Sequence, residues 1–371
     1  MNTDLSQAAS LIRKQIRMAT TGFVGREQIA ELMILAAVAQ EHLLIIGPPG
    51  TAKSAVVRRV ASTLGGRYFE YMLGRFTEPN ELFGAIDLQQ LKAGRVEIDT
   101  TGMLPEAEIA FLDEIFLGST AILNTLLGIL NERTFRKGHT QKACPLQVCV
   151  GAANALPDDQ ALHAFADRFL IHTFVEPVAD HYLEDMLEQG WQAQHHDVIT
   201  AQGMESLISL TEAAQTVDLT AVRPDLASAI RLLRQKGLQL SDRRIVKSQR
   251  LIAAAAVLSG RTAASMADLW PLLYVLPTQA AQISAREILQ DVLIHAASNH
   301  LHLAVEQAVQ QPKSRESRLL EQAHALLQAP QIESGQVEPL LREIDANFST
   351  EQLSDDLALA RQQLASRLNP A

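Results

Sequence analysis

A glycine-containing loop, GPPGTAKS at residues 47–54, stands between a short apolar run and a helical stretch. It nearly matches the pattern G-x-x-x-x-G-K-[ST], in which backbone N–H groups and a lysine bind the phosphates of a nucleotide. We expect Lys53 to reach the β- and γ-phosphates and the Ser54 hydroxyl to ligate Mg²⁺. Ala52 replaces a glycine, which is tolerable where φ is negative and prohibitive where the position demands a left-handed conformation. The predicted contacts in the loop are Gly47, Pro49, Gly50, Thr51, Ala52, Lys53, Ser54 and Ala55.

Two acids at the end of another apolar run supply a second motif. Residues 109–114 read IAFLDE, a predicted strand that ends in Asp113 and Glu114. We expect Asp113 to hold Mg²⁺ through its water shell and Glu114 to polarise the water that attacks the terminal phosphate. The alternative is a surface-exposed strand end with paired acids, which the presence of both motifs in one chain disfavours. Together the motifs predict hydrolysis of ATP with Mg²⁺ as the metal.

Two further polar residues stand where a γ-phosphate could be sensed. Asn154 follows the buried run VCVGAA, and its amide can orient the water beside Glu114; the alternative is an Asx turn before Pro157. Arg168 lies in ADRFLI just before another predicted strand. An arginine there can reach the nucleotide of a neighbouring subunit and raise the rate by roughly 10³ to 10⁵. A salt bridge to Asp167 or a helix C-cap is its alternative.

Short apolar runs alternate with helical stretches over the first half of the chain. Strands are predicted near residues 42–47, 67–73, 108–114, 146–154 and 170–177. Because strands that alternate with helices form parallel sheets, this region predicts an α/β fold whose mostly parallel sheet is covered on both faces.

The chain after about Pro177 reads as helix throughout. The helix in SDRRIVKSQRLIAAAAVLSG is predicted to begin after Ser241 as its N-cap and to end near Gly260. From about Ala285 onward, four amphipathic helices are predicted. The predicted domains are an α/β nucleotide-binding domain at 1–185, a helical lid at 186–284 and a C-terminal helical region at 285–371.

The composition argues against a nucleic-acid-binding, zinc-binding or membrane-spanning protein. The formal net charge of -10 weighs against a nucleic-acid partner, because such binding rests on neutralising phosphates with Lys and Arg. Cys144 and Cys149 lack the spacing and partners of a zinc site and are expected to be apolar strand residues. No apolar run approaches roughly 20 residues, so no transmembrane segment is predicted and a cytoplasmic location is expected.

Several of these stretches resemble one known family when they are taken together. GPPGTAKS, FLDEIF, AILNTLLGILNERTFRKG, AANALP and ADRFLI are similar to the MoxR family of AAA+ ATPases, and specifically to its RavA-like branch. In that family the loop commonly carries alanine before the lysine. The resemblance implies a P-loop AAA+ core with a five-stranded parallel sheet, an all-α lid, and a homo-oligomeric, hexameric ring that binds ATP between subunits.

The resemblance also implies roles for individual residues. It suggests Asn154 as sensor 1, Arg168 as the finger that acts in trans, and Arg243 as the arginine of sensor 2, with its neighbour Arg244 left open. The residues implied to pack on adenine are Phe23, Val24 and Gly25, in GFVGRE.

Two inserts are implied at residues 81–104 and 133–148, lining the pore or upper face of the ring. In the second insert, Phe135, Arg136 and Lys137 are candidates to contact a client protein. The alternative for these three is a solvated hairpin tip.

MoxR-type ATPases act as chaperone-like remodellers or activators of a partner protein, often beside a protein with a von Willebrand factor A domain. The resemblance therefore implies this function and this partner. Two alternatives remain open: a nucleic-acid-stimulated AAA+ motor, which the acidic balance disfavours, and a scaffold gated by nucleotide binding.

Overall fold

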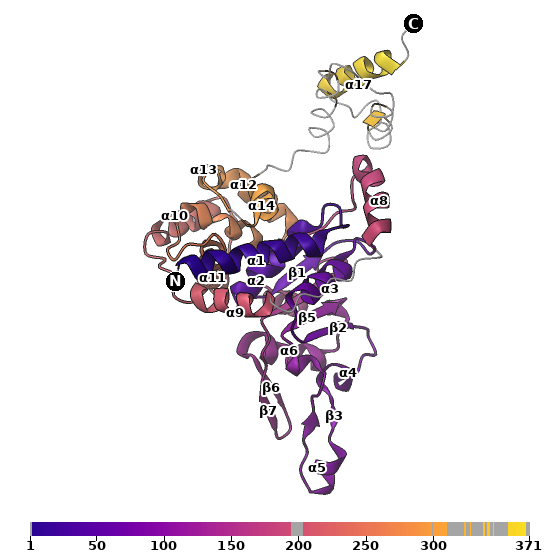
Figure 1. Cartoon of the computed structure of the whole chain (residues 1–371), viewed down its shortest axis with the longest axis vertical. Helices are drawn as coiled ribbons and strands as arrows, with labels where there is room; N and C mark the ends of the chain where they lie inside the picture. Colours follow the sequence, from indigo (N-terminus) through magenta and orange to yellow (C-terminus); the bar gives the residue numbers. More distant parts are fainter. Residues whose placement is uncertain are drawn as a thin grey trace. The chain divides into compact units, whose positions relative to one another are not determined.

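Five parallel strands form one sheet in the order β2-β5-β8-β1-β9 (Figure 1). They are β1 Leu43–Ile46, β2 Tyr68–Met72, β5 Ile109–Asp113, β8 Val148–Ala153 and β9 Ile171–Phe174. The computed structural model describes residues 2–193, 203–298, 300–309 and 355–368, together with residues 323, 327, 337, 340, 341 and 344. All five strands predicted from the apolar runs are confirmed, and their parallel pairing confirms the α/β class.

Different helices cover the two faces of the sheet. Leu43 and Ile45 of β1 belong to one apolar cluster with residues of α2 and α3, whereas Leu44 and Ile46 belong to another with residues of α6 and α7. This division follows from the strand itself, because successive side chains point to opposite faces. The helices and 3₁₀ turns here are α1 Asn2–Thr20, α2 Glu27–Val38, α3 Lys53–Leu64, α4 Pro79–Phe83, η1 Leu104–Glu106, η2 Ile115–Leu117, α6 Thr120–Glu132 and α7 Gln160–Ala166.

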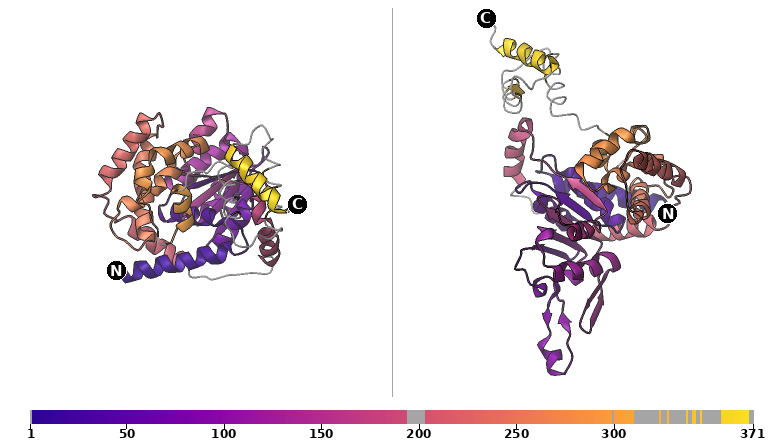
Figure 2. Two further views of the ribbon diagram at one scale, coloured as in Figure 1. Left: turned by 90° about the horizontal axis from the view of Figure 1, so that it is seen from above. Right: turned by 180° about the vertical axis from the view of Figure 1, so that it is seen from behind.

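Two hairpins extend from the same side of this core (Figures 1 and 2). In the first, β3 Ala85–Ile86 and β4 Ile98–Asp99 flank α5 Leu88–Lys92, and in the second β6 Thr134–Lys137 pairs with β7 Thr140–Ala143. The Ile98 amide donates to the Thr140 hydroxyl at 2.8 Å, which joins the hairpins. The ring of Phe135 is fully buried and stacks on Phe83 at 5.7 Å. The prediction that Phe135 contacts a client is therefore wrong, because its side chain faces inward. Arg136 and Lys137 are exposed, and their contact with a client stays a prediction.

The chain after β9 is mainly helical. Its elements are η3 Asp180–Tyr182, α8 Leu183–Ala193, α9 Gly203–Ala214, α10 Arg223–Gln235, α11 Asp242–Leu258, η4 Met266–Asp268, η5 Trp270–Val275, α12 Gln279–Ile288, α13 Gln290–Leu293 and α14 His302–Val309. The predicted ends of α11 are confirmed. The Ser241 hydroxyl accepts a hydrogen bond from the Arg244 amide at 3.3 Å, and Gly260 has φ 75 just after the helix.

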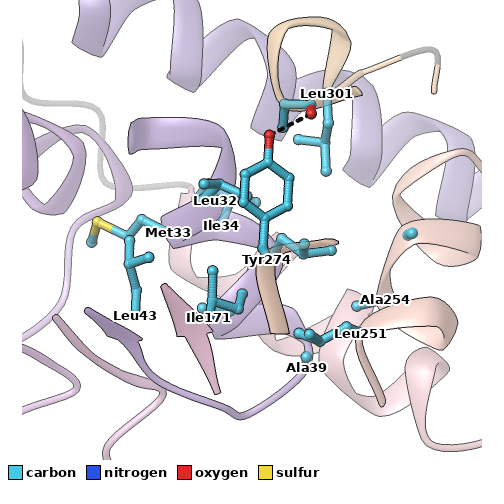
Figure 3. Close-up of a cluster of buried hydrophobic side chains, with 14 of the residues drawn as sticks. Leu32, Met33, Ile34, Ala39, Leu43, Ile171, Leu251, Ala254, Tyr274 and Leu301 are labelled. Carbon is cyan, nitrogen blue, oxygen red and sulfur yellow. Dashed lines mark hydrogen bonds between the residues drawn. The ribbon is translucent and has the colours of Figure 1, made fainter. Parts of the chain in front are cut away.

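One apolar cluster joins these helices to the sheet. Leu251 of α11 and Tyr274 of η5 pack with Leu32 of α2 and Ile171 of β9 (Figure 3). The buried Tyr274 hydroxyl donates to the Ala304 carbonyl oxygen at 2.6 Å, so its polar atom is satisfied. These helices are therefore fixed to the α/β core by shared burial of apolar surface.

Contacts divide the chain into two compact units, Met1–Pro177 with Gln189–Val309 and Val178–Glu188 with Gln310–Ala371. The second unit has its own apolar cluster, to which α17 Asp355–Leu368 contributes Leu357 and Leu364. Much of the predicted C-terminal region, residues 310–354, lies outside the described residues apart from isolated positions. The predicted boundaries at residues 185 and 284 stay a prediction. Within the described chain, no helix combines the length and apolar character needed to traverse a bilayer.

A buried acid in the core predicts how stability depends on pH. The carboxylate of Glu31 on α2 accepts from the Ala304 amide at 2.6 Å, and burial raises the pKa of Glu31 to about 7. The folded state then binds more protons than the unfolded state between about pH 4.5 and 7, so stability falls as pH rises through this window. Glu31→Gln should reduce that loss by up to about 3 kcal/mol, measured as the free energy of unfolding between pH 5 and 8. Exposed Glu212→Gln is the control, and equal pH slopes for wild type and Glu31→Gln would contradict the assignment.

Candidate active site

The predicted phosphate loop runs from the end of β1 into α3. A Cβ at Gly47 would come within 2.3 Å of the Val175 carbonyl oxygen, so only glycine fits there. Gly50 has φ +80, in the left-handed region that glycine adopts freely. The Lys53 ammonium donates to the carbonyl oxygens of Gly47 and Pro48 at 2.7 and 2.9 Å. The Lys53 ammonium thus lies against the loop that leads into α3. Such a loop and the first amides of the helix that follows it together bind phosphate groups in other proteins.

Ala52 has a left-handed backbone, with φ 61 and ψ 20 at the N-cap of α3. Sequence reasoning expected an alanine to be excluded from such a conformation, and that expectation is wrong. An L-residue in this region costs about 1–2 kcal/mol, which persists only where the surroundings fix the backbone. They do so here, because the Thr51 carbonyl accepts from buried Arg26 and the Thr51 hydroxyl donates to the Pro48 carbonyl, both at 2.9 Å.

Replacing Ala52 by glycine should stabilise the fold. Glycine relieves the left-handed strain, partly offset by its greater freedom in the unfolded chain, so we expect the free energy of unfolding to rise by about 0.5–1 kcal/mol. Ala55→Gly, inside α3, is the matched control and should destabilise by about 0.5–1 kcal/mol. Denaturant unfolding measures both. Equal destabilisation by the two changes would show that residue 52 is not left-handed.

The acids and the amide predicted to act on water lie at the carboxyl ends of adjacent strands. Strand β8 runs between β5 and β1, so Asn154 stands between the acid pair and the phosphate loop. The Asn154 side-chain amide donates to Glu114 Oε1 at 2.5 Å. The Asp113 carboxylate accepts from the Glu114 amide at 2.9 Å. Burial lowers the pKa of Lys53, and the negative charges of Asp113 and Glu114 oppose that change. The two carboxylates therefore interact electrostatically with the Lys53 ammonium.

The donor set fits a magnesium ion. Ser54, in the first turn of α3, and Asp113, at the end of β5, offer a hydroxyl and a carboxylate. Both are hard oxygen ligands, and Mg²⁺ takes few protein ligands because it keeps several waters and phosphate oxygens. Ser54 and Asp113 are thus the residues that would hold Mg²⁺.

The stretch implied to contact adenine lies against the phosphate loop and α3. The Arg59 guanidinium of α3 stacks 4.6 Å from the centre of the Phe23 ring. Next to Val24 and Gly25, buried Arg26 donates to the carbonyl oxygens of Thr51 and Glu176 at 2.9 Å each. Arg26 therefore holds the loop in place, a role that sequence reasoning missed because nothing in the local pattern marks an arginine whose partners are 25 and 150 residues away.

A second group of charges gathers around Asp167, the C-cap of α7. Arg168, Arg243 and Arg244 have nitrogens 3.8, 3.4 and 2.6 Å from its carboxylate. This cluster precedes β9 and lies at the amino edge of the sheet, whereas the phosphate loop leaves β1 at the carboxyl edge, a strand length of roughly 13 Å away. Because three cations share one anion, the amino edge has an excess of positive charge.

The three arginines of this cluster differ in how far their hydrogen-bonding groups are used. Arg244 is 3% exposed and also donates to the carbonyl oxygens of Phe169, at 3.1 Å, and Val275. It therefore ties the lid to the start of β9. Arg243 donates to the Asp167 carbonyl oxygen at 2.9 Å and to Asn131 Oδ1 at 2.7 Å, and its side chain remains 26% exposed. The Nε of Arg168 is buried and has no hydrogen-bond partner among the described residues.

Comparisons with known proteins agree with this geometry. Residues 10–212 match the family model of the MoxR domain in the MoxR-vWA-beta-propeller ternary systems, and residues 217–291 match an AAA lid domain. Two uncharacterized proteins of Methanocaldococcus jannaschii are each 35% identical over 67% and 68% of this chain. The match spans 66% of each relative's own length, slightly less than two thirds. Chaperone MoxR1 of Mycobacterium tuberculosis is 27% identical over 40% of this chain and 39% of that protein.

A solved structure shares the fold. The crystal structure of a candidate ATPase from Cytophaga hutchinsonii has a TM-score of 0.62 at 17% identity and covers 80% of this chain and 97% of its own. The MoxR model alone matches more than half of the 371 residues. The chain belongs to the MoxR family of AAA+ ATPases.

Proposed function

We propose that this protein binds and hydrolyses ATP with Mg²⁺ and uses the cycle to remodel or activate a partner protein. The observation that carries the proposal is the hydrogen bond of 2.5 Å between Asn154 and Glu114, beside the phosphate loop. It holds a carboxylate and an amide in the arrangement that orients a water for attack on a γ-phosphate.

In this proposal each residue of the carboxyl edge has a separate task. Lys53 leaves the loop carbonyls to bind the β- and γ-phosphates, and the first amides of α3 bind the same anion. Ser54 and Asp113 would hold Mg²⁺, which would supply positive charge beside the phosphates. Glu114 polarises the attacking water, and Asn154 keeps the Glu114 carboxylate in position as sensor 1.

We assign Arg168 and Arg243 to the nucleotide of a neighbouring subunit. Both lie at the amino edge, away from the loop of their own subunit, and Arg168 has a buried Nε without a partner among the described residues. The excess of positive charge there attracts a triphosphate from another copy. This assignment requires a ring, for which we propose six subunits. It favours Arg243 over Arg244 as the sensor 2 arginine, because Arg244 is only 3% exposed whereas the Arg243 side chain is 26% exposed.

The partner we propose is a protein with a von Willebrand factor A domain. Support comes from the matching family, whose description names MoxR-vWA-beta-propeller ternary systems. Chaperone MoxR1 supports the remodelling role by its name. We keep the RavA-like branch as a prediction from the quoted motifs. The buried free cysteines Cys144 and Cys149 fit the proposed cytoplasmic location.

Lys53→Ala tests nucleotide binding directly. The change removes the charge-assisted hydrogen bonds from Nζ to phosphate, so isothermal titration calorimetry should show ATP affinity about 10- to 100-fold weaker. Exposed Lys14→Ala removes a like charge from α1 and should leave the affinity unchanged. If Lys53→Ala binds ATP as tightly as wild type, the loop is not the phosphate site and the proposed function fails.

A further inference from the structure

A cavity of about 410 Å³ opens between the end of α2 and the lid helices α9, α10 and α11. Its size lies within the roughly 300–1,000 Å³ typical of small-molecule sites. Gln40, which lines it, precedes β1, whereas the phosphate loop follows β1. The cavity is therefore separate from the proposed ATP site.

Part of the lining of the cavity is apolar. Ala214, at the end of α9, and Val217 and Leu219, between α9 and α10, line the cavity and are half-buried, so each keeps some apolar surface in contact with water. A ligand body that removes water from these groups gains free energy in proportion to the apolar area it covers.

Two arginines also line the cavity. Arg223 donates from Nε to Gln249 Oε1 at 3.2 Å, which orients its guanidinium. Arg250 is 59% exposed and has one bond, of 3.0 Å, to the fully buried carboxylate of Glu41. Lys247 also lies 2.6 Å from Glu41, so two cations already oppose that single anion.

Among the described residues that line the cavity, none carries a carboxylate. Asp218 lies nearby in the chain. Its carboxylate accepts from the Thr220 amide at 2.9 Å and also interacts with the charge of Arg223. The described lining therefore combines two guanidinium groups with apolar side chains and contains no carboxylate, while Glu41 and Asp218 interact with these arginines from outside the lining. A planar guanidinium pairs most favourably with a carboxylate, in a bidentate geometry.

We propose that this cavity binds a small organic carboxylate with an apolar body, whose charge pairs with Arg223 and Arg250 while its body covers Ala214, Val217 and Leu219. Since α2 belongs to the α/β core and α9, α10 and α11 to the helical part, the ligand holds the two together. Such binding stabilises the folded chain by mass action.

The test uses 4-phenylbutyrate as the probe on the full chain, by calorimetry and thermal melting. We expect saturable binding and a rise in Tm. Three matched compounds separate the contributions of the carboxylate and of the apolar body to binding. 4-Phenylbutanol lacks the charge, acetate lacks the apolar body, and inorganic phosphate offers another anion. Each should bind at least about tenfold more weakly. Binding of phosphate or acetate as tight as that of the probe, or no saturable binding of the probe, would overturn the proposal.

Variants locate the probe in the cavity. Arg223→Gln should weaken probe binding at least about tenfold, and Ala214→Leu should abolish it by filling the space from α9. Exposed Arg231→Gln on the same helix as Arg223 is the matched control. Lys53→Ala should bind the probe as wild type does, which keeps this inference independent of the proposed ATPase. Unchanged affinity of both Arg223→Gln and Ala214→Leu for the probe would show that it binds elsewhere and would contradict the proposal.

Discussion

Glu114→Gln is expected to hydrolyse ATP about 10²- to 10⁴-fold more slowly than wild type, the range that a positioned general base contributes. The amide of glutamine cannot accept the proton of the attacking water. Its oxygen can still accept the hydrogen bond that Asn154 now gives to Glu114 Oε1 at 2.5 Å. The change therefore removes the chemistry while keeping the arrangement of the site.

Binding should survive this change, because Lys53 and the loop amides make the contacts to phosphate. We expect ATP affinity by calorimetry to stay within about twofold, while phosphate release falls to near zero. Glu205→Gln, an exposed acid on α9, is the control and should turn over normally. Unchanged hydrolysis in Glu114→Gln would remove Glu114 from the mechanism. A wild-type chain that binds ATP without measurable hydrolysis would instead favour the scaffold gated by nucleotide.

The parts of this architecture that depend on local sequence were predictable. Each of the five strands is a short apolar run, and a run of four to six residues is shorter than a typical helix, so its length favours a strand. The Ser241 cap and the Gly260 stop are likewise decided by side chains and backbone freedom within one turn of α11. The phosphate loop and the acid pair follow from the same rule, since each sits at the end of such a strand.

Features that depend on partners distant in the chain were not predictable. Phe135 is buried because Phe83, more than fifty residues earlier, offers a ring to stack on. Asp167 gathers Arg243 and Arg244 only after the lid packs on β9. The left-handed backbone of Ala52 depends in the same way on Arg26 reaching the neighbouring carbonyl. A single sequence shows neither these pairings nor the strain that they hold in place.

Arg168→Ala is expected to lower hydrolysis in rings of that variant alone by about 10³-fold or more, the effect of losing an arginine that contacts the transferred phosphate. Loss of stability would not explain this result. The pair with Asp167 is 3.8 Å long and both side chains are about 30% exposed, so it contributes at most about 1 kcal/mol. Arg231→Ala, which removes an exposed arginine from α10, is the control and should hydrolyse ATP at the wild-type rate.

Mixing subunits tests whether Arg168 acts across an interface. An Arg168→Ala subunit keeps its acid pair but lacks the arginine, and a Glu114→Gln subunit keeps the arginine but lacks the base. In a mixed ring, an Arg168→Ala subunit beside a Glu114→Gln subunit regains a complete site, so hydrolysis should recover part of the wild-type rate although each variant alone is inactive. Arg168→Ala mixed with the Arg168→Ala, Glu114→Gln double variant supplies no arginine and should stay inactive. If both mixtures are equally inactive, Arg168 does not serve the neighbouring nucleotide, and the excess charge around Asp167 has a structural role within one subunit.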